Sequence, residues 1–65
     1  MRLTINGEDR TIDTAATVAD LLGELGITAT KVAVERNLEI VPRDGYDAIR
    51  IETGDRLEIV HFVGG

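Results

Sequence analysis

One stretch near the N-terminus decides the fold: Arg2-Leu3-Thr4-Ile5-Asn6-Gly7-Glu8-Asp9-Arg10-Thr11-Ile12-Asp13. Its Asn-Gly pair is the strongest two-residue signal for a β-hairpin, because both central positions of a type I′ turn need φ > 0. A two-residue loop pairs Ile5 with Glu8 and Leu3 with Arg10, and this register gathers the apolar side chains on one face of the hairpin. The residues on that face are Met1, Leu3, Ile5 and Ile12.

A helix is predicted to follow the hairpin. Thr17 is a good N-cap, and Asp20 stands three residues later, where its carboxylate supports the first turn. Gly26 is suited to end the helix, because glycine readily adopts the left-handed conformation that follows a last turn. Apolar residues at i, i+3, i+4 and i+7 form one stripe for the core: Val18, Leu21, Leu22 and Leu25.

The middle of the chain predicts a third strand and a short return. Residues 32–35 alternate valine with alanine or glutamate, which is typical of a strand. Asn37 turns the chain, and Leu38 and Ile40 suggest a short continuation that Pro42 ends.

Beyond the proline, the pattern is less regular. Residues 43–48 are predicted to form an irregular loop, and Ile49 and Ile51 mark a minor strand or a turn. Thr53-Gly54-Asp55 is typical of a turn, and residues 57–63 form the last predicted strand.

The order of these elements, ββαβ(β)β, predicts an α+β fold in which a mixed sheet packs on one helix. A β-grasp roll, forming a single domain over residues 1–65, is the simplest such arrangement. A chain of 65 residues has a marginal core and little space to enclose a deep pocket. Size therefore favours a binding or carrier module over a self-sufficient enzyme, and no catalytic residue is assigned.

Composition excludes several classes of partner. Seven basic against twelve acidic residues give a net charge of −5, which argues against nucleic acid as a ligand. An acidic surface could complement a basic protein, although solubility is the simpler interpretation. The sequence has no cysteine and no apolar run long enough for a membrane span, so we expect a cytoplasmic protein in a reducing compartment.

The C-terminal residues carry the main functional hypothesis: Val60-His61-Phe62-Val63-Gly64-Gly65. Two glycines after a strand predict a mobile arm, residues 63–65, which could thread a narrow channel in a partner; a flexible end without function is the alternative. A terminal carboxylate accepts sulfur only after it gains a leaving group, most simply by adenylation with ATP. A partner must supply that site, since the sequence has no phosphate-binding loop and Lys31 is its only lysine.

Val60 and Phe62 are candidates for a docking patch. If Leu57 and Ile59 face the core, strict alternation places Glu58, Val60 and Phe62 on the opposite face, close to the arm. The alternative is a bulge that turns Phe62 inward.

Several segments resemble the ThiS family, the sulfur carriers of thiamin (thiazole) biosynthesis. The resemblance covers nearly the whole chain. It is carried by Thr17-Val18-Ala19-Asp20-Leu21-Leu22, Val32-Ala33-Val34, Ile40-Val41-Pro42-Arg43, Gly54-Asp55-Arg56-Leu57-Glu58-Ile59 and Gly64-Gly65. Two positions depart from the family pattern: Asn37-Leu38-Glu39 replaces a more polar or glycine-containing turn, and Tyr46 stands where relatives often have tryptophan.

This resemblance implies a ubiquitin-like β-grasp fold and a protein that is a carrier and not an enzyme. It also implies that an adenylating enzyme of the ubiquitin-activating type converts Gly65 to an acyl adenylate with ATP, while the carrier needs no cofactor of its own. A cysteine-derived persulfide then yields a thiocarboxylate on Gly65, whose sulfur passes to thiazole synthase. Val63 and Gly64 would lie in the partner's active-site channel.

Other functions remain open from the residues alone. The small subunit of molybdopterin synthase has the same fold and Gly-Gly end, a protein-conjugating modifier would join Gly65 to a lysine, and a plain interaction module would make no use of the glycines.

No metal site is predicted. His61 is interpreted as a surface residue, and Asp44 and Asp47 are interpreted as solvated loop charges.

Overall fold

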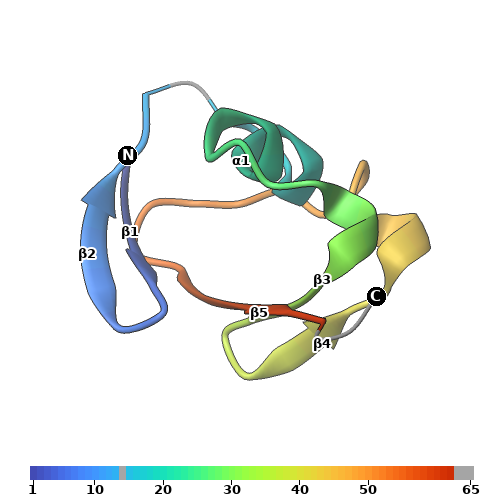
Figure 1. The fold of residues 1–65 in the computed structure, drawn as a ribbon. Coiled ribbons are helices and arrows are strands. Elements are labelled where there is room, and N and C mark those ends of the chain that lie inside the picture. Colours follow the sequence, from blue (N-terminus) through green and yellow to red (C-terminus); the bar gives the residue numbers. More distant parts are fainter. Residues whose placement is uncertain (14, 63–65) are drawn as a thin grey trace.

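The computed structural model describes residues 1–13 and 15–62. Within these residues a mixed five-stranded sheet, ordered β2-β1-β5-β3-β4, carries helix α1 over one of its faces (Figure 1). β1 and β5 are parallel, and the other neighbours are antiparallel. The strands are β1 (Arg2–Ile5), β2 (Glu8–Thr11), β3 (Val32–Arg36), β4 (Glu39–Val41) and β5 (Arg56–His61), and α1 spans Val18–Glu24. The predicted mixed sheet on a single helix is confirmed.

The N-terminal hairpin has the predicted register. Ile5 pairs with Glu8 and Leu3 with Arg10, and the turn residues have positive φ angles of 51° at Asn6 and 82° at Gly7. β2 ends at Thr11, two residues earlier than predicted, although Ile12 and Met1 still exchange backbone hydrogen bonds of 2.9 and 2.8 Å beyond it. Ile12 stays buried, whereas Met1 at the open end of the hairpin is partly exposed.

Helix α1 begins as predicted. The Thr17 hydroxyl accepts a hydrogen bond from the Asp20 N–H at 3.2 Å, and the Asp20 carboxylate accepts one from the Thr17 N–H at 3.2 Å, which completes a capping box. Gly26 follows the helix with φ 72°. A seven-residue helix is marginal by itself, so its buried stripe of Val18, Leu21 and Leu22 stabilises it against the sheet.

Tyr46 belongs to the core. The sequence pattern predicts an irregular loop here, but the structure buries the Tyr46 ring, and its hydroxyl donates to the Val32 carbonyl oxygen at 3.2 Å. That hydrogen bond ties the loop to β3 and satisfies the only polar atom of the tyrosine side chain. The same loop contains a short 3-10 turn, Arg43–Gly45, and Ile51 beyond it is buried.

β5 lies between β1 and β3, and asparagines from both hairpin turns bind its backbone. The Asn6 side chain accepts from the Ile59 N–H at 2.7 Å and donates to the Ile59 carbonyl at 3.1 Å, as a neighbouring strand would. Asn37, in the β3–β4 turn, accepts from the Arg56 N–H at 2.9 Å. Each asparagine therefore provides a turn conformation and also a ladder contact for the central strand.

Asp55 joins this turn to the start of β5. Its carboxylate accepts hydrogen bonds from Arg36 Nε at 2.7 Å, Asn37 Nδ2 at 3.1 Å and the Glu52 N–H at 2.8 Å, and only 7% of the residue is exposed. Burial alone would raise the pKa of Asp55. The hydrogen bonds from Glu52, Arg36 and Asn37, with the charge of Arg36, outweigh burial and hold the pKa below its usual value.

Replacement of Asp55 by asparagine should therefore destabilise the protein at neutral pH by about 2 kcal/mol, because the variant leaves Arg36 without its buried partner. A carboxyl whose pKa is lowered by folding stabilises the folded state above its unfolded pKa, and this stabilisation is lost as the pH falls through the folded value. In urea titrations, the difference between wild type and Asp55→Asn should be constant from roughly pH 6 to 8 and should shrink below roughly pH 4. A difference that persists undiminished in acid would show that side-chain shape, not charge, sets the cost.

Candidate functional site

The sheet face opposite α1 carries exposed apolar side chains near the end of β5. Val60 is 60% exposed and Phe62 is 52% exposed, as the docking-patch hypothesis requires. The alternative, in which a bulge turns Phe62 into the core, is wrong. Regular pairing continues past the end of β5, since the Phe62 N–H donates to the Lys31 carbonyl at 3.0 Å. The strand itself ends at His61, earlier than the predicted residue 63.

Strand register extends this patch to β4. Val60 lies opposite Ala33, and Ile40 lies opposite Glu35 on the same face, where 77% of Ile40 is exposed. Sequence analysis assigned Ile40 to a short strand but missed its place in the patch, because that place depends on which strands are neighbours. We call Ile40, Val60 and Phe62 the outer-face patch.

Two glutamates lie directly opposite one another beside the outer-face patch. Glu35 on β3 pairs in register with Glu58 on β5, and across the described part of the chain neither carboxylate takes part in an ion pair. Like charges in directly opposed positions destabilise a sheet. The fold therefore tolerates an unfavourable pair on the face that also exposes its apolar residues.

Arg43 contacts the patch from the loop after β4. Its guanidinium carbon lies over the Phe62 ring, 5.5 Å from the ring centroid, which is a cation–π contact. Pro42 precedes it with φ −60° and ends β4, so the Pro-Arg sequence delivers the arginine to this position. The predicted arm residues Val63, Gly64 and Gly65 lie outside the described residues, which end at Phe62 beneath Arg43.

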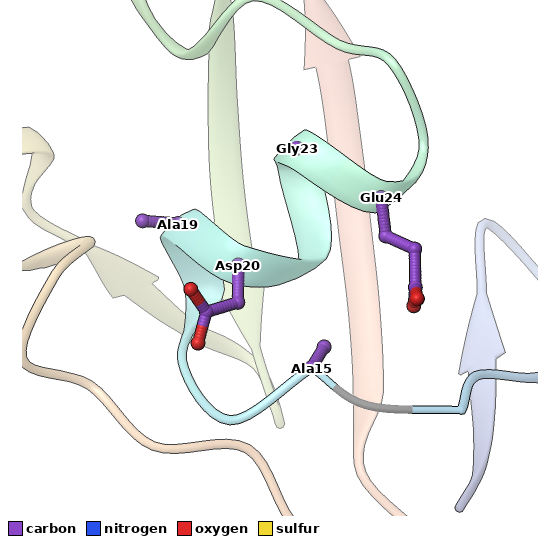
Figure 2. A pocket seen from close by; sticks show the side chains of 5 residues that line it. All are labelled: Ala15, Ala19, Asp20, Gly23 and Glu24. Carbon is purple, nitrogen blue, oxygen red and sulfur yellow. The ribbon is translucent and has the colours of Figure 1, made fainter.

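A hollow lies beside α1. It is lined by Ala15, Ala19, Asp20, Gly23 and Glu24, and the Asp20 side chain points back toward the segment that precedes the helix (Figure 2). That carboxylate accepts from the backbone N–H groups of Ala16 and Thr17. The Asp20 carboxylate in this hollow is thus engaged in capping the helix.

Neither a metal site nor a membrane segment is found in the described residues. No three histidine, cysteine or acidic side chains come together among them, and Asp44, Asp47 and His61 are all exposed. Among the same residues there is no helix with the length and apolarity that a bilayer crossing requires.

Comparison with known proteins places the chain in a family. The ThiS family model matches residues 3–65. The chain belongs to the ThiS family. It is 39% identical over 64 residues to the sulfur carrier protein ThiS of Bacillus subtilis, covering 97% of each chain. The crystal structure of a thiamine biosynthesis protein (ThiS) from Geobacter metallireducens is 40% identical, with a TM-score of 0.87 over 100% of this chain and 99% of that one. These matches confirm the ubiquitin-like β-grasp fold.

Longer proteins also match this chain over its whole length. The chain is 57% identical to a thiazole synthase of Paramagnetospirillum magneticum and 42% identical to a thiazole synthase of Magnetococcus marinus. In both cases the alignment takes in all 65 residues of the chain but 20% of the relative. The chain thus spans about a fifth of the length of these two proteins.

The turn between β3 and β4 is strained. Asn37 and Leu38 have φ angles of 51° and 71°, and asparagine tolerates such values far better than leucine does. Leu38 is also 81% exposed, so burial of its side chain compensates for little of the strain.

Leu38→Gly should stabilise the protein by about 1 kcal/mol, because glycine adopts this conformation without steric cost. Leu38→Ala is the matched control: it shortens the side chain but keeps the strain, so we expect little change. Urea unfolding of both variants measures the difference. A loss of stability in the glycine variant alone would mean that the backbone strain is not the dominant contribution at this position.

Proposed function

We propose that this ThiS-family chain is a sulfur carrier whose working group is the α-carboxylate of Gly65. The supporting observation is the Gly64-Gly65 pair in a ThiS-family chain, which follows the central strand β5 closely in the sequence. The proposal requires that Gly65 carry a free carboxylate. The family match favours the thiazole pathway over the molybdopterin synthase small subunit and over a protein-conjugating modifier.

The chemistry proceeds in steps that a partner performs. A Gly65 carboxylate oxygen attacks the α-phosphorus of ATP and releases pyrophosphate, which turns a resonance-stabilised anion into an acyl adenylate. The terminal sulfur of a cysteine persulfide then attacks the acyl carbon, and AMP leaves. A thiol reduces the resulting sulfur–sulfur bond, leaving a thiocarboxylate on Gly65 and a disulfide elsewhere. Thiazole synthase receives the sulfur.

The carrier itself contributes the arm and a docking surface. This sequence has no phosphate-binding loop, so a partner would supply the ATP site. The family resemblance implies that this partner is an adenylating enzyme of the ubiquitin-activating type. Val63 and the two glycines would lie in the enzyme channel, where small side chains permit close approach. Val60 and Phe62, with Ile40, would pack on the enzyme surface and position the arm. The cytoplasmic location expected from the sequence stays a prediction.

The carrier chemistry predicts a sulfur-bearing Gly65. After incubation with ATP, a persulfide donor and an adenylating enzyme of a thiamin pathway, mass spectrometry of the C-terminal fragment should show one oxygen replaced by sulfur. The fragment must be resolved, because oxidation of Met1 gives nearly the same mass shift. A thiol-selective alkylator should label only this group, since the chain has no cysteine.

Gly64→Val is the matched variant for that experiment. Its unfolding midpoint should equal that of wild type, while modification of Gly65 should be lost, because a branched side chain obstructs the channel. If wild-type Gly65 stays unmodified under conditions in which the same enzyme modifies a known carrier, the proposed function is wrong.

The outer-face patch predicts a separable binding defect. Val60→Thr and Ile40→Thr nearly preserve side-chain shape on exposed strand positions, so the free energy of unfolding should change by less than about 0.5 kcal/mol. Affinity for the adenylating enzyme should fall about tenfold for each. Thr11→Ser, which removes a methyl group on β2 at the opposite edge of the sheet, is the control. If all three variants bound the adenylating enzyme with wild-type affinity in calorimetric titrations, the patch would be excluded as the docking surface.

A further inference from the structure

Arg43 is held in place by the buried part of its loop. The turn Arg43–Gly45 begins directly after Pro42, and the Tyr46 N–H donates to the Arg43 carbonyl at 3.3 Å. Tyr46, the residue that follows this turn, is buried, and its hydroxyl donates a hydrogen bond to the Val32 carbonyl. The backbone from which the arginine projects is therefore fixed against β3, and its long side chain begins from a defined point.

The guanidinium of Arg43 meets Phe62 and leaves its own donors available. The Arg43 guanidinium carbon lies 5.5 Å from the centroid of the Phe62 ring, and the five N–H donors of a guanidinium all lie in its own plane. Among residues 1–13 and 15–62, the side chain of Arg43 makes no hydrogen bond or ion pair, whereas Arg2 and Arg36 are each paired with carboxylates. Arg43 thus presents a planar set of donors next to a half-exposed ring.

Charge and desolvation limit which groups of a partner could bind to Arg43 and Phe62. The chain has a net charge of −5, so its overall field attracts a basic partner, and a fixed cation at the patch has the opposite sign. When a protein surface covers Phe62, the adjacent guanidinium loses water, and an unpaired buried charge is strongly unfavourable. A carboxylate satisfies a guanidinium with two parallel hydrogen bonds and so restores the lost hydration.

We infer that Arg43 and Phe62 act as one recognition element, and that the adenylating enzyme meets it with an Asp or Glu carboxylate in the guanidinium plane beside an apolar recess for the ring. This deepens the proposed function, on which the identity of the partner rests. The pairing selects against surfaces that cover Phe62 without offering a carboxylate, because those surfaces leave the guanidinium desolvated and unpaired.

The test is calorimetric binding of the full chain to the adenylating enzyme without ATP, at low and high salt. Arg43→Gln should weaken binding by roughly tenfold or more, and Arg43→Lys nearly as much, because lysine keeps the charge but lacks the planar fork. Arg10→Gln removes the same charge from an exposed position on β2 and should change affinity less than about twofold. Unfolding curves of every variant should match that of wild type within about 0.5 kcal/mol.

A double-mutant cycle tests whether the two side chains act together. Phe62→Leu keeps an apolar side chain but removes the ring, and the double variant Arg43→Gln/Phe62→Leu should lose less affinity than the product of the two single losses. Affinities of Arg43→Gln and Arg43→Lys within twofold of wild type would overturn the inference. So would equal losses for Arg43→Gln and Arg10→Gln, which would show that net charge alone matters.

Acyl-adenylate formation, measured on the same samples with ATP added, separates this inference from the proposed function. Binding that depends on Arg43 without modification of Gly65 would refute the carrier chemistry and leave the recognition element standing. Adenylation of wild type, with the same KM for the Arg43 variants, would support the carrier chemistry and refute the recognition element. Absence of both binding and adenylation would overturn both.

Discussion

The carboxylate of Asp55 connects segments that the chain order keeps apart. It accepts hydrogen bonds from Arg36 at the end of β3, from Asn37 in the following turn and from the backbone of Glu52 before β5. These contacts align β3 and β5, whose ladder carries both the buried valines of the core and the exposed Val60. Because β5 also runs parallel to β1, this single buried acid sets the position of the strand on which the whole sheet is assembled. The arm follows that strand, so its starting point depends on the same contacts.

The two faces of the sheet differ in how many energetically unfavourable features they carry. Toward α1, each buried side-chain polar atom among the described residues is hydrogen-bonded, and the core is a continuous aliphatic cluster with one tyrosine. The other face exposes Val60 and Ile40 and places Glu35 opposite Glu58. Unfavourable features gathered on one face, while the other face is well satisfied, are typical of a functional surface. The fold retains them because the aliphatic core supplies sufficient stability.

The small size of the chain explains why its proposed chemistry lies at an end. The helix and the sheet use their facing surfaces for the core, and the hollow beside α1 has its Asp20 carboxylate engaged in the helix cap. A domain of this length therefore offers a partner an edge, a face and a terminus more readily than an enclosed site. An activating enzyme that binds the face and accepts the terminus would supply the pocket that the carrier lacks.

Local patterns in the sequence predicted most of the secondary structure. The Asn-Gly turn, the Thr17 cap and the apolar stripe of α1 depend on φ preferences and on periodicities of two and 3.6 residues, which act over a few neighbours. The Val60 and Phe62 exposure also followed from alternation along one strand. The element ends were less accurate, since β2 ends at Thr11 and β5 at His61, each two residues before the predicted end.

The sequence by itself therefore determined the elements, their faces and the glycine pair at residues 64 and 65. Only the tertiary structure decided which residues meet: Ile40 with the patch, Tyr46 with the core, Arg43 with Phe62 and Arg36 with Asp55. These pairs join segments many residues apart, and no short-range preference specifies them. Their contacts arise from the order and direction of the strands, which are set by the packing of the whole chain around one core.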